Sequence, residues 1–205
     1  LIATDAFPPN CGGSGWSSFE LARALTRRGH AVTVVVPKPG QAGDTSRELD
    51  GLPIEEIGLP SARIPVVRNY VKNERLWPRL AARLADVAAF SRADLIHAQH
   101  QLTAPAAVLA ARRAGIPVVC TLRDYWPVCY WGTTIVDPGS PALCPGCSAA
   151  MMVQCLKPRA GAAWVPALGA IPYMRGNLLR KQRALAGADA LIAVSRTIAG
   201  DLVRL

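Results

Sequence analysis

Long apolar runs are missing from this sequence, since no stretch approaches the ~18 consecutive apolar residues that a membrane-spanning helix needs. The chain starts Leu1-Ile2-Ala3-Thr4-Asp5, which lacks the basic start and apolar centre of a secretion signal. These absences argue against an integral membrane protein and predict a cytoplasmic one. The start reads as the end of a strand, so we expect further residues to precede it.

Dense runs of one charge are missing as well. Lys and Arg number 23 against 14 Asp and Glu, for a formal net charge of +9, but the positive residues are scattered. No basic cluster or aromatic-interleaved basic stripe is present, so we expect no nucleic acid partner. The net charge favours acidic partners such as phosphorylated substrates, and it allows a peripheral contact with the inner face of the membrane.

Short apolar segments alternate with helical patterns along the 205 residues, of which 51% are hydrophobic and 18% charged. Apolar, often β-branched runs predict strands, and leucine and alanine at helical spacing predict helices. The predicted strands are 1–4, 31–36, 93–99, 116–122 and 188–195, with a weak one at 54–57 inside a mostly loop-like segment 37–72. The predicted helices are 17–29, opened by a Ser17–Glu20 capping box, then 76–88, 104–114, 177–186 and one starting at Arg196.

This alternation with short connections predicts an α/β fold. We expect a doubly wound, mostly parallel, Rossmann-like sheet with helices on both faces. The chain, residues 1–205, is expected to be one such domain with a long irregular stretch before residue 177. That stretch includes a cysteine-rich insertion at 129–159.

Ligands of such sheets bind beyond the carboxyl ends of the strands. Four polar segments fall at predicted strand ends: the glycine loop before residue 17, Pro37-Lys38, residues 97–100 and Arg123-Asp124. We therefore expect the site at that edge of the sheet.

Two familiar phosphate-binding fingerprints are absent. Gly13-Ser14-Gly15 is followed by Trp16-Ser17-Ser18, so the third glycine of the dinucleotide-binding G-x-G-x-x-G pattern is missing. The second predicted strand ends in Pro37-Lys38, with no carboxylate for a ribose, and no Gly-Lys-Ser/Thr sequence occurs. Gly12, Gly13 and Gly15 nevertheless stand where a helix begins, either for a tight turn or to bring bare amides to an anion.

Five segments in the same order resemble the N-terminal domain of family 4 glycosyltransferases. They are Phe7-Pro8-Pro9 with Gly12-Gly13, "LARALTRRGHAVTVV" (21–35), "ADLIHAQH" (93–100), "GIPVVCTLRDYW" (115–126) and "ADALIAVS" (188–195). The resemblance implies a GT-B enzyme of two Rossmann-like domains facing across a cleft. In that architecture the N-terminal domain mainly binds the acceptor, and a C-terminal domain with a paired-glutamate motif binds the nucleotide-sugar. We expect that second domain to be absent from these 205 residues.

The resemblance also suggests residue roles. Gly12 and Gly13 match the glycine pair whose amides approach the donor diphosphate. Where family members commonly have Thr-x-His-Asp, this chain has Thr121-Leu122-Arg123-Asp124. Arg123 stays protonated and cannot act as a general base, but it can bind a phosphate or stabilise the leaving diphosphate. Arg123 and Asp124 are the candidate catalytic residues.

Several further side chains at the predicted site have two interpretations each. His97 is interpreted as structural and His100 as the better candidate for binding the acceptor. The aromatic residues Trp126, Tyr130 and Trp131 either stack on a sugar or pack in the core. Trp126 is the aromatic that we assign to the acceptor site.

Four cysteines lie close together in sequence: Cys129, Cys144, Cys147 and Cys155. The Cys-Pro-Gly-Cys turn at 144–147 is suited to pointing two sulfurs at one ion, and the other two complete a tetrahedral set. Structural zinc is the predicted ligand, with an iron–sulfur cluster, disulfides and independent thiols as alternatives. We expect no cofactor for the catalysis itself.

The function predicted from these features is the acceptor-binding half of a retaining glycosyltransferase. It transfers a sugar from a nucleotide-sugar to a hydroxyl of a glycan, a lipid-linked acceptor or a small molecule, and is inactive without the second domain. The alternative is a metal-stabilised α/β interaction module with no catalysis of its own.

Overall fold

The computed structural model describes residues 1–61, 63, 71 and 76–205, and the chain divides into two compact units. Unit 1 comprises Leu1–Leu122 with Gly187–Ile192. Unit 2 comprises Arg123–Ala186 with Ala193–Leu205.

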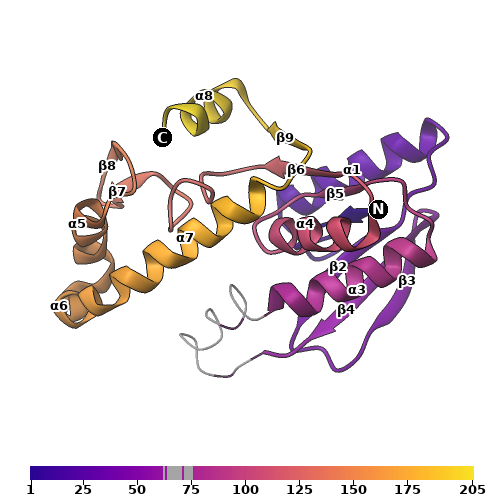
Figure 1. Ribbon diagram of the computed structural model, residues 1–205, viewed down its shortest axis with the longest axis horizontal. Helices are drawn as coiled ribbons and strands as arrows, with labels where there is room; N and C mark the ends of the chain where they lie inside the picture. The colour runs from indigo at the N-terminus through magenta and orange to yellow at the C-terminus, as the bar shows by residue number, and fades with distance from the viewer. Residues whose placement is uncertain (62, 64–70, 72–75) are drawn as a thin grey trace. The chain divides into compact units, whose positions relative to one another are not determined.

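A seven-stranded sheet forms the centre of unit 1 (Figure 1). In spatial order its strands are β3 (Thr45–Leu49), β4 (Leu52–Leu59), β2 (Val34–Pro39), β1 (Ile2–Ala3), β5 (Ile96–Ala98), β6 (Val118–Leu122) and β9 (Ala190–Ala193). The pairings from β4 through β6 are parallel, and β3 pairs antiparallel with β4. From β4 to β9 this is the strand order of a dinucleotide-binding fold, so the predicted mostly parallel, Rossmann-like α/β class is confirmed.

Three helices of unit 1 pack through different kinds of side chain. α1 (Gly13–Arg27) contributes Phe19 and Ala22 to a core that includes Ile2 and Val34. α3 (Leu76–Phe90) buries leucines at every fourth position, and α4 (Thr103–Ala114) buries a face made mainly of alanine. Small side chains on α4 let it pack closely against α3 and against β1, β5 and β6.

Most predicted elements of unit 1 are confirmed, with shifted ends. The strand predicted at 31–36 is β2, which begins three residues later, and the helices predicted at 76–88 and 104–114 are α3 and α4. Gly115 ends α4 in a left-handed conformation at φ 67°.

Two local predictions are wrong. The segment 37–72 is not mostly loop in its described part, because it contains β3 and extends the weak strand at 54–57 into the eight-residue β4; residues 62, 64–70 and 72 lie outside the described residues. The Ser17–Glu20 capping box does not form, since α1 already begins at Gly13 with Gly12 as its N-cap. Glu20 instead pairs with Arg23 at 3.2 Å.

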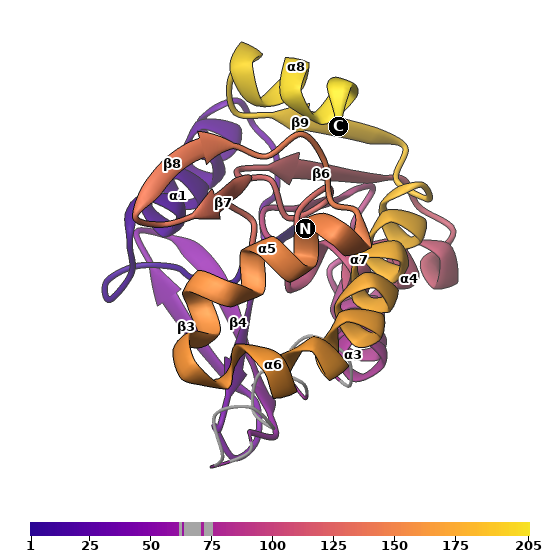
Figure 2. The same ribbon diagram turned by 90° about the vertical axis from the view of Figure 1, so that its left-hand side faces the viewer.

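Unit 2 is built from a two-stranded ribbon and a chain of helices. The ribbon pairs β7 (Ile135–Asp137) with β8 (Ser140–Leu143) in antiparallel fashion. The helices are α5 (Ala149–Ala160), α6 (Trp164–Ala167), α7 (Ile171–Leu185) and α8 (Arg196–Arg204), with 3₁₀ turns at Gly161–Ala163 and Leu168–Ala170. Figure 2 shows α6 between α5 and α7. The stretch predicted to be irregular before residue 177 therefore contains regular elements.

A small core holds the helices of unit 2 together. Met152 and Leu156 of α5 pack against Met174 and Leu178 of α7. Arg159 ties the ribbon to α5, because its guanidinium donates hydrogen bonds to the carbonyls of Ile135 at 2.7 Å and Val136 at 2.5 Å.

Candidate functional site

The glycine loop leads from β1 directly into α1. Gly12, the N-cap of α1, has extended backbone angles and no side chain with which to cap the helix. The first turn of α1, all of which the structure describes, contains no acidic residue. The helix therefore presents its free amides and the positive end of its dipole without a carboxylate to neutralise them.

The three glycines at this position have different steric surroundings. A β-carbon on Gly15 would lie 2.5 Å from the Cys11 sulfur and 3.1 Å from the Ala6 carbonyl oxygen, so packing requires glycine there. A β-carbon on Gly12 or Gly13 would meet no heavy atom within 4 Å, and neither residue has a positive φ. Packing within the chain therefore accounts for Gly15 alone, and a close backbone approach by a ligand would account for the other two.

Asp5 joins the ends of β1 and β5. Its carboxylate accepts hydrogen bonds from the amides of Leu102 at 3.2 Å and Thr103 at 3.1 Å, at the start of α4. A carboxylate there satisfies orphan amides and complements the positive end of the helix. No role for Asp5 was predicted from the sequence, although an acidic residue just after a strand is a signal for such a cap.

The two histidines after β5 differ in their surroundings. His97 Nε2 lies 2.7 Å from the Thr121 hydroxyl on β6, which supports the structural interpretation of this residue. His100 lies in the loop before α4 and is half-buried, and its carbonyl accepts a hydrogen bond from the Ala104 amide at 2.8 Å. Because Asp5 ties this loop to the end of β1, His100 belongs to the same edge of the sheet as the glycine loop.

Arg123 and Asp124 follow β6 directly in the chain and open unit 2. Both are half-buried. Burial lowers the pKa of the Arg123 guanidinium, which nevertheless remains protonated at neutral pH. The Asp124 carboxylate accepts a hydrogen bond from the Trp126 amide at 2.9 Å, which fixes the orientation of one of its oxygens. The pair therefore offers a fixed cation and a positioned carboxylate.

The aromatic residues after this pair are not equally accessible. Trp126 is 1% exposed, so its burial favours the packing interpretation over stacking on a sugar. Trp131 is 39% exposed, and the Arg159 guanidinium lies 5.2 Å from its ring centroid. Of these two tryptophans, Trp131 is the one whose face is open to solvent.

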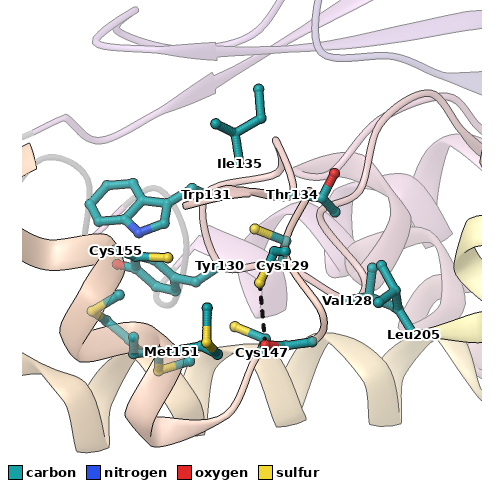
Figure 3. A pocket seen from close by; sticks show the side chains of 14 residues that line it. Val128, Cys129, Tyr130, Trp131, Thr134, Ile135, Cys147, Met151, Cys155 and Leu205 are labelled. Carbon is teal, nitrogen blue, oxygen red and sulfur yellow. Dashed lines mark hydrogen bonds between the residues drawn. The ribbon is translucent and has the colours of Figure 1, made fainter. Parts of the chain in front are cut away.

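The structure brings the four predicted cysteines together. Cys129, Cys144, Cys147 and Cys155 all line one cavity of about 10 Å³ in unit 2 (Figure 3). Among the described residues, however, no group of three or more His, Cys, Asp or Glu side chains is placed to hold a metal ion. The cysteines thus converge as predicted, but their thiols do not form a coordination sphere as they stand.

Larger cavities in unit 1 lie away from the glycine loop. One of about 440 Å³, lined by Leu1, His30, Thr33 and Asp94, sits at the amino ends of β1, β2 and β5. Another of about 590 Å³ lies beside α3 and is lined by Glu55, Arg83 and Phe90. Neither cavity adjoins the carboxyl ends of the strands, where ligands of this fold bind.

Comparison with known proteins identifies a family. Residues 11–205 match the family described as Glycosyltransferase Family 4. No curated protein matches the chain. A solved structure described as "Trehalose-6-phosphate from E. coli bound with UDP-2-fluoro glucose" aligns with 99% of this chain at 11% identity and a TM-score of 0.48. The chain spans 41% of the length of that structure. In the described part of the chain, every helix is too short or too polar to span a bilayer.

Proposed function

This chain belongs to glycosyltransferase family 4, and we propose that it is the acceptor-binding half of a retaining glycosyltransferase. The strand order supports a doubly wound sheet with helices on both faces. In the GT-B arrangement that the family implies, a second domain of the same kind faces this one across a cleft and binds most of the nucleotide-sugar.

The observation that carries this proposal is the open glycine pair at the start of α1. Gly12 and Gly13 leave room for an anion to approach the backbone, and the uncapped helix end attracts negative charge. A sugar-nucleotide diphosphate carries the matching negative charge. As the bond from the anomeric carbon to the diphosphate breaks, a bond to the acceptor oxygen forms, and the acceptor hydroxyl gives its proton to the departing phosphate oxygen. The amides stabilise the negative charge that develops on this leaving group.

Arg123 and Asp124 are the proposed catalytic residues. The half-buried guanidinium of Arg123 is suited to neutralising the departing diphosphate, since it carries a permanent charge with bidentate donors. Asp124 contributes the carboxylate beside it, oriented by the Trp126 amide. His100 is proposed to contact the acceptor.

The surface of unit 2 is the basis on which we propose a peripheral membrane contact. Residues 160–174, here called the tip segment, contain no charged residue and include α6, and Val165 is 56% exposed. Lys157, Arg159 and Arg175 flank it, and the Lys157 ammonium lies 5.8 Å from the Trp164 ring centroid. Apolar and aromatic residues bordered by cations fit the interface of an anionic bilayer. This surface supports a lipid-linked acceptor at the inner face of the membrane.

The test uses the protein encoded by the whole gene and a panel of nucleotide-sugars. Gly13→Val is expected to lower kcat/KM for the donor about 100-fold, because a side chain displaces the diphosphate from the amides. Gly200→Val is the matched control, since Gly200 is also a helical glycine with no heavy atom within 4 Å of an added β-carbon.

Three outcomes distinguish the alternatives. An unchanged kcat/KM in Gly13→Val would overturn the diphosphate role of the glycine pair. A whole-gene protein that transfers no sugar from any donor would favour the interaction module without catalysis. Turnover by residues 1–205 alone would overturn the assignment of this chain as one half of the enzyme.

A further inference from the structure

Four cysteines from three segments of unit 2 meet at one cavity. Cys129 lies in the loop after Arg123-Asp124, Cys144 and Cys147 follow β8, and Cys155 lies in α5. Figure 3 shows Cys129, Cys147 and Cys155 around this cavity. Sequence proximity alone does not require this arrangement, because the ribbon and the first turns of α5 intervene between these residues.

The cavity has room for one small occupant. Its volume of about 10 Å³ corresponds to roughly one water-sized sphere, which excludes a sugar or a nucleotide. Its remaining lining is largely apolar, with Val128, Met151, Met152 and Met174 among the residues. An apolar wall gives a bound water few hydrogen-bond partners, so the cavity suits a single soft ion that bonds to sulfur.

Burial raises the pKa of the Cys147 and Cys155 thiols, while one hydrogen-bond donor and two cationic side chains nearby act in the opposite direction. The Tyr130 backbone amide donates a hydrogen bond to Cys147, and the positive charge of Arg175 acts on the same sulfur. The positive charge of Arg159 acts on Cys155. A divalent ion with four thiolates carries a net charge of −2, which two nearby guanidinium groups offset. An amide donor to a ligating sulfur is the kind of outer-shell contact that orients metal ligands.

The turn between Cys144 and Cys147 has the form of a metal-binding knuckle. Gly146 adopts φ 151°, a conformation that side chains disfavour, so the turn requires glycine. The Cys144 thiol donates a hydrogen bond to the Gly146 carbonyl at 3.3 Å, so its sulfur is directed at the backbone of the turn that contains it. This accounts for part of the lack of a coordination sphere among the described residues. Rotation about a single side-chain bond redirects such a sulfur without moving the backbone.

We propose that Cys129, Cys144, Cys147 and Cys155 bind one structural zinc ion. Four thiolates at about 2.3 Å in a tetrahedral arrangement form a closed site that leaves no position for a substrate. Space for one atom favours a single ion over an iron–sulfur cluster, which also needs inorganic sulfide. Disulfides are neutral, so the positive charges of Arg159 and Arg175 would not stabilise them. The site is independent of the proposed transferase activity.

The ion would link three segments that the protein core joins only weakly. The core between α5 and α7 is small, with four buried side chains at its centre. Small cores are commonly supplemented by a metal, whose binding free energy then contributes to folding. The loop that contains Cys129 also contains Asp124, so the zinc would hold that loop in place without entering the chemistry. We propose on the same grounds that residues 129–159 form an insertion whose fold depends on this metal.

The experiment measures metal in protein purified without chelators. We expect about one zinc per chain in the wild type and in Cys11→Ser, and loss of zinc in Cys147→Ser and Cys155→Ser. Cys11 is the matched control because it is a half-buried cysteine of the glycine loop in unit 1. Replacement by cobalt should give the intense sulfur-to-cobalt charge-transfer absorption of a tetrahedral four-thiolate site.

A second measurement covers variants that fail to fold. In the wild type, the four cluster thiols should resist a thiol-specific reagent until a strong chelator is added, and the melting temperature should then fall. Wild-type protein with far less than one zinc per chain would overturn the proposal. The proposal would also be overturned by equal zinc content in Cys147→Ser and the wild type. Disulfides among these cysteines in the unreduced protein, or iron with sulfide in place of zinc, would overturn it as well.

Discussion

Gly15 is packed directly against Cys11, since a β-carbon on Gly15 would lie 2.5 Å from the Cys11 sulfur. Gly15→Ala is therefore expected to lower the free energy of unfolding by about 1–3 kcal/mol, as overpacking does elsewhere. Gly13→Ala is the matched variant, and it should leave stability unchanged or raise it by under about 1 kcal/mol. Urea unfolding of both variants measures the difference, and equal losses would contradict the distinction between packing and ligand glycines.

Asp5 should stabilise unit 1 through the start of α4. Replacing it with Ala removes the acceptor of the Leu102 and Thr103 amides, and the loss of such a cap typically costs about 1 kcal/mol. Asp5→Asn, which keeps one oxygen acceptor but no charge, should retain part of that stability. Hydrogen exchange at the two amides is the direct measurement. Unchanged protection of both amides in Asp5→Ala would contradict the capping role.

The sheet and its helices could be predicted because their signals are local. β2 and β6 are short β-branched runs, and α3 repeats leucine at helical spacing. The four cysteines were also found from spacing alone, and the structure gathers them around one cavity. In each case neighbouring residues in the sequence carry the information.

Other features depend on partners that are distant in sequence or carry no apolar signal. β3 is a polar, largely exposed edge strand without the alternation that marks a half-buried one. Its signal was the turn instead: Asp50 and Gly51 both have positive φ, and Asp-Gly is a strong hairpin sequence. The burial of Trp126 could not be read from sequence, because an aromatic residue after a strand serves stacking and packing equally well.

Glu56 gives unit 1 a stability that depends on pH. Burial raises its pKa, but hydrogen bonds from Arg47 and Lys38 outweigh that effect, so the folded pKa lies below the usual value. The stabilisation is therefore full above the unfolded pKa of about 4.3 and is lost as the pH falls through the folded value.

Glu56→Gln tests that dependence. At neutral pH the variant should be less stable than the wild type by about 1 kcal/mol, the scale of a partly exposed ion pair. The difference should shrink as the pH falls below about 4, because the wild-type carboxylate then also becomes neutral. Urea unfolding across this range measures it, and parallel stability curves would contradict the role of Glu56.

The tip segment should bind anionic membranes through its apolar surface. Val165→Asp places a charge within the uncharged residues 160–174, where burial in the headgroup region would be costly. We expect it to reduce binding to vesicles rich in phosphatidylglycerol several-fold. Val203→Asp is the matched control, because Val203 is 90% exposed on α8 and outside the tip segment. Flotation with anionic and neutral vesicles measures the bound fraction; equal binding by both variants, or no preference for the anionic vesicles, would contradict the proposed contact.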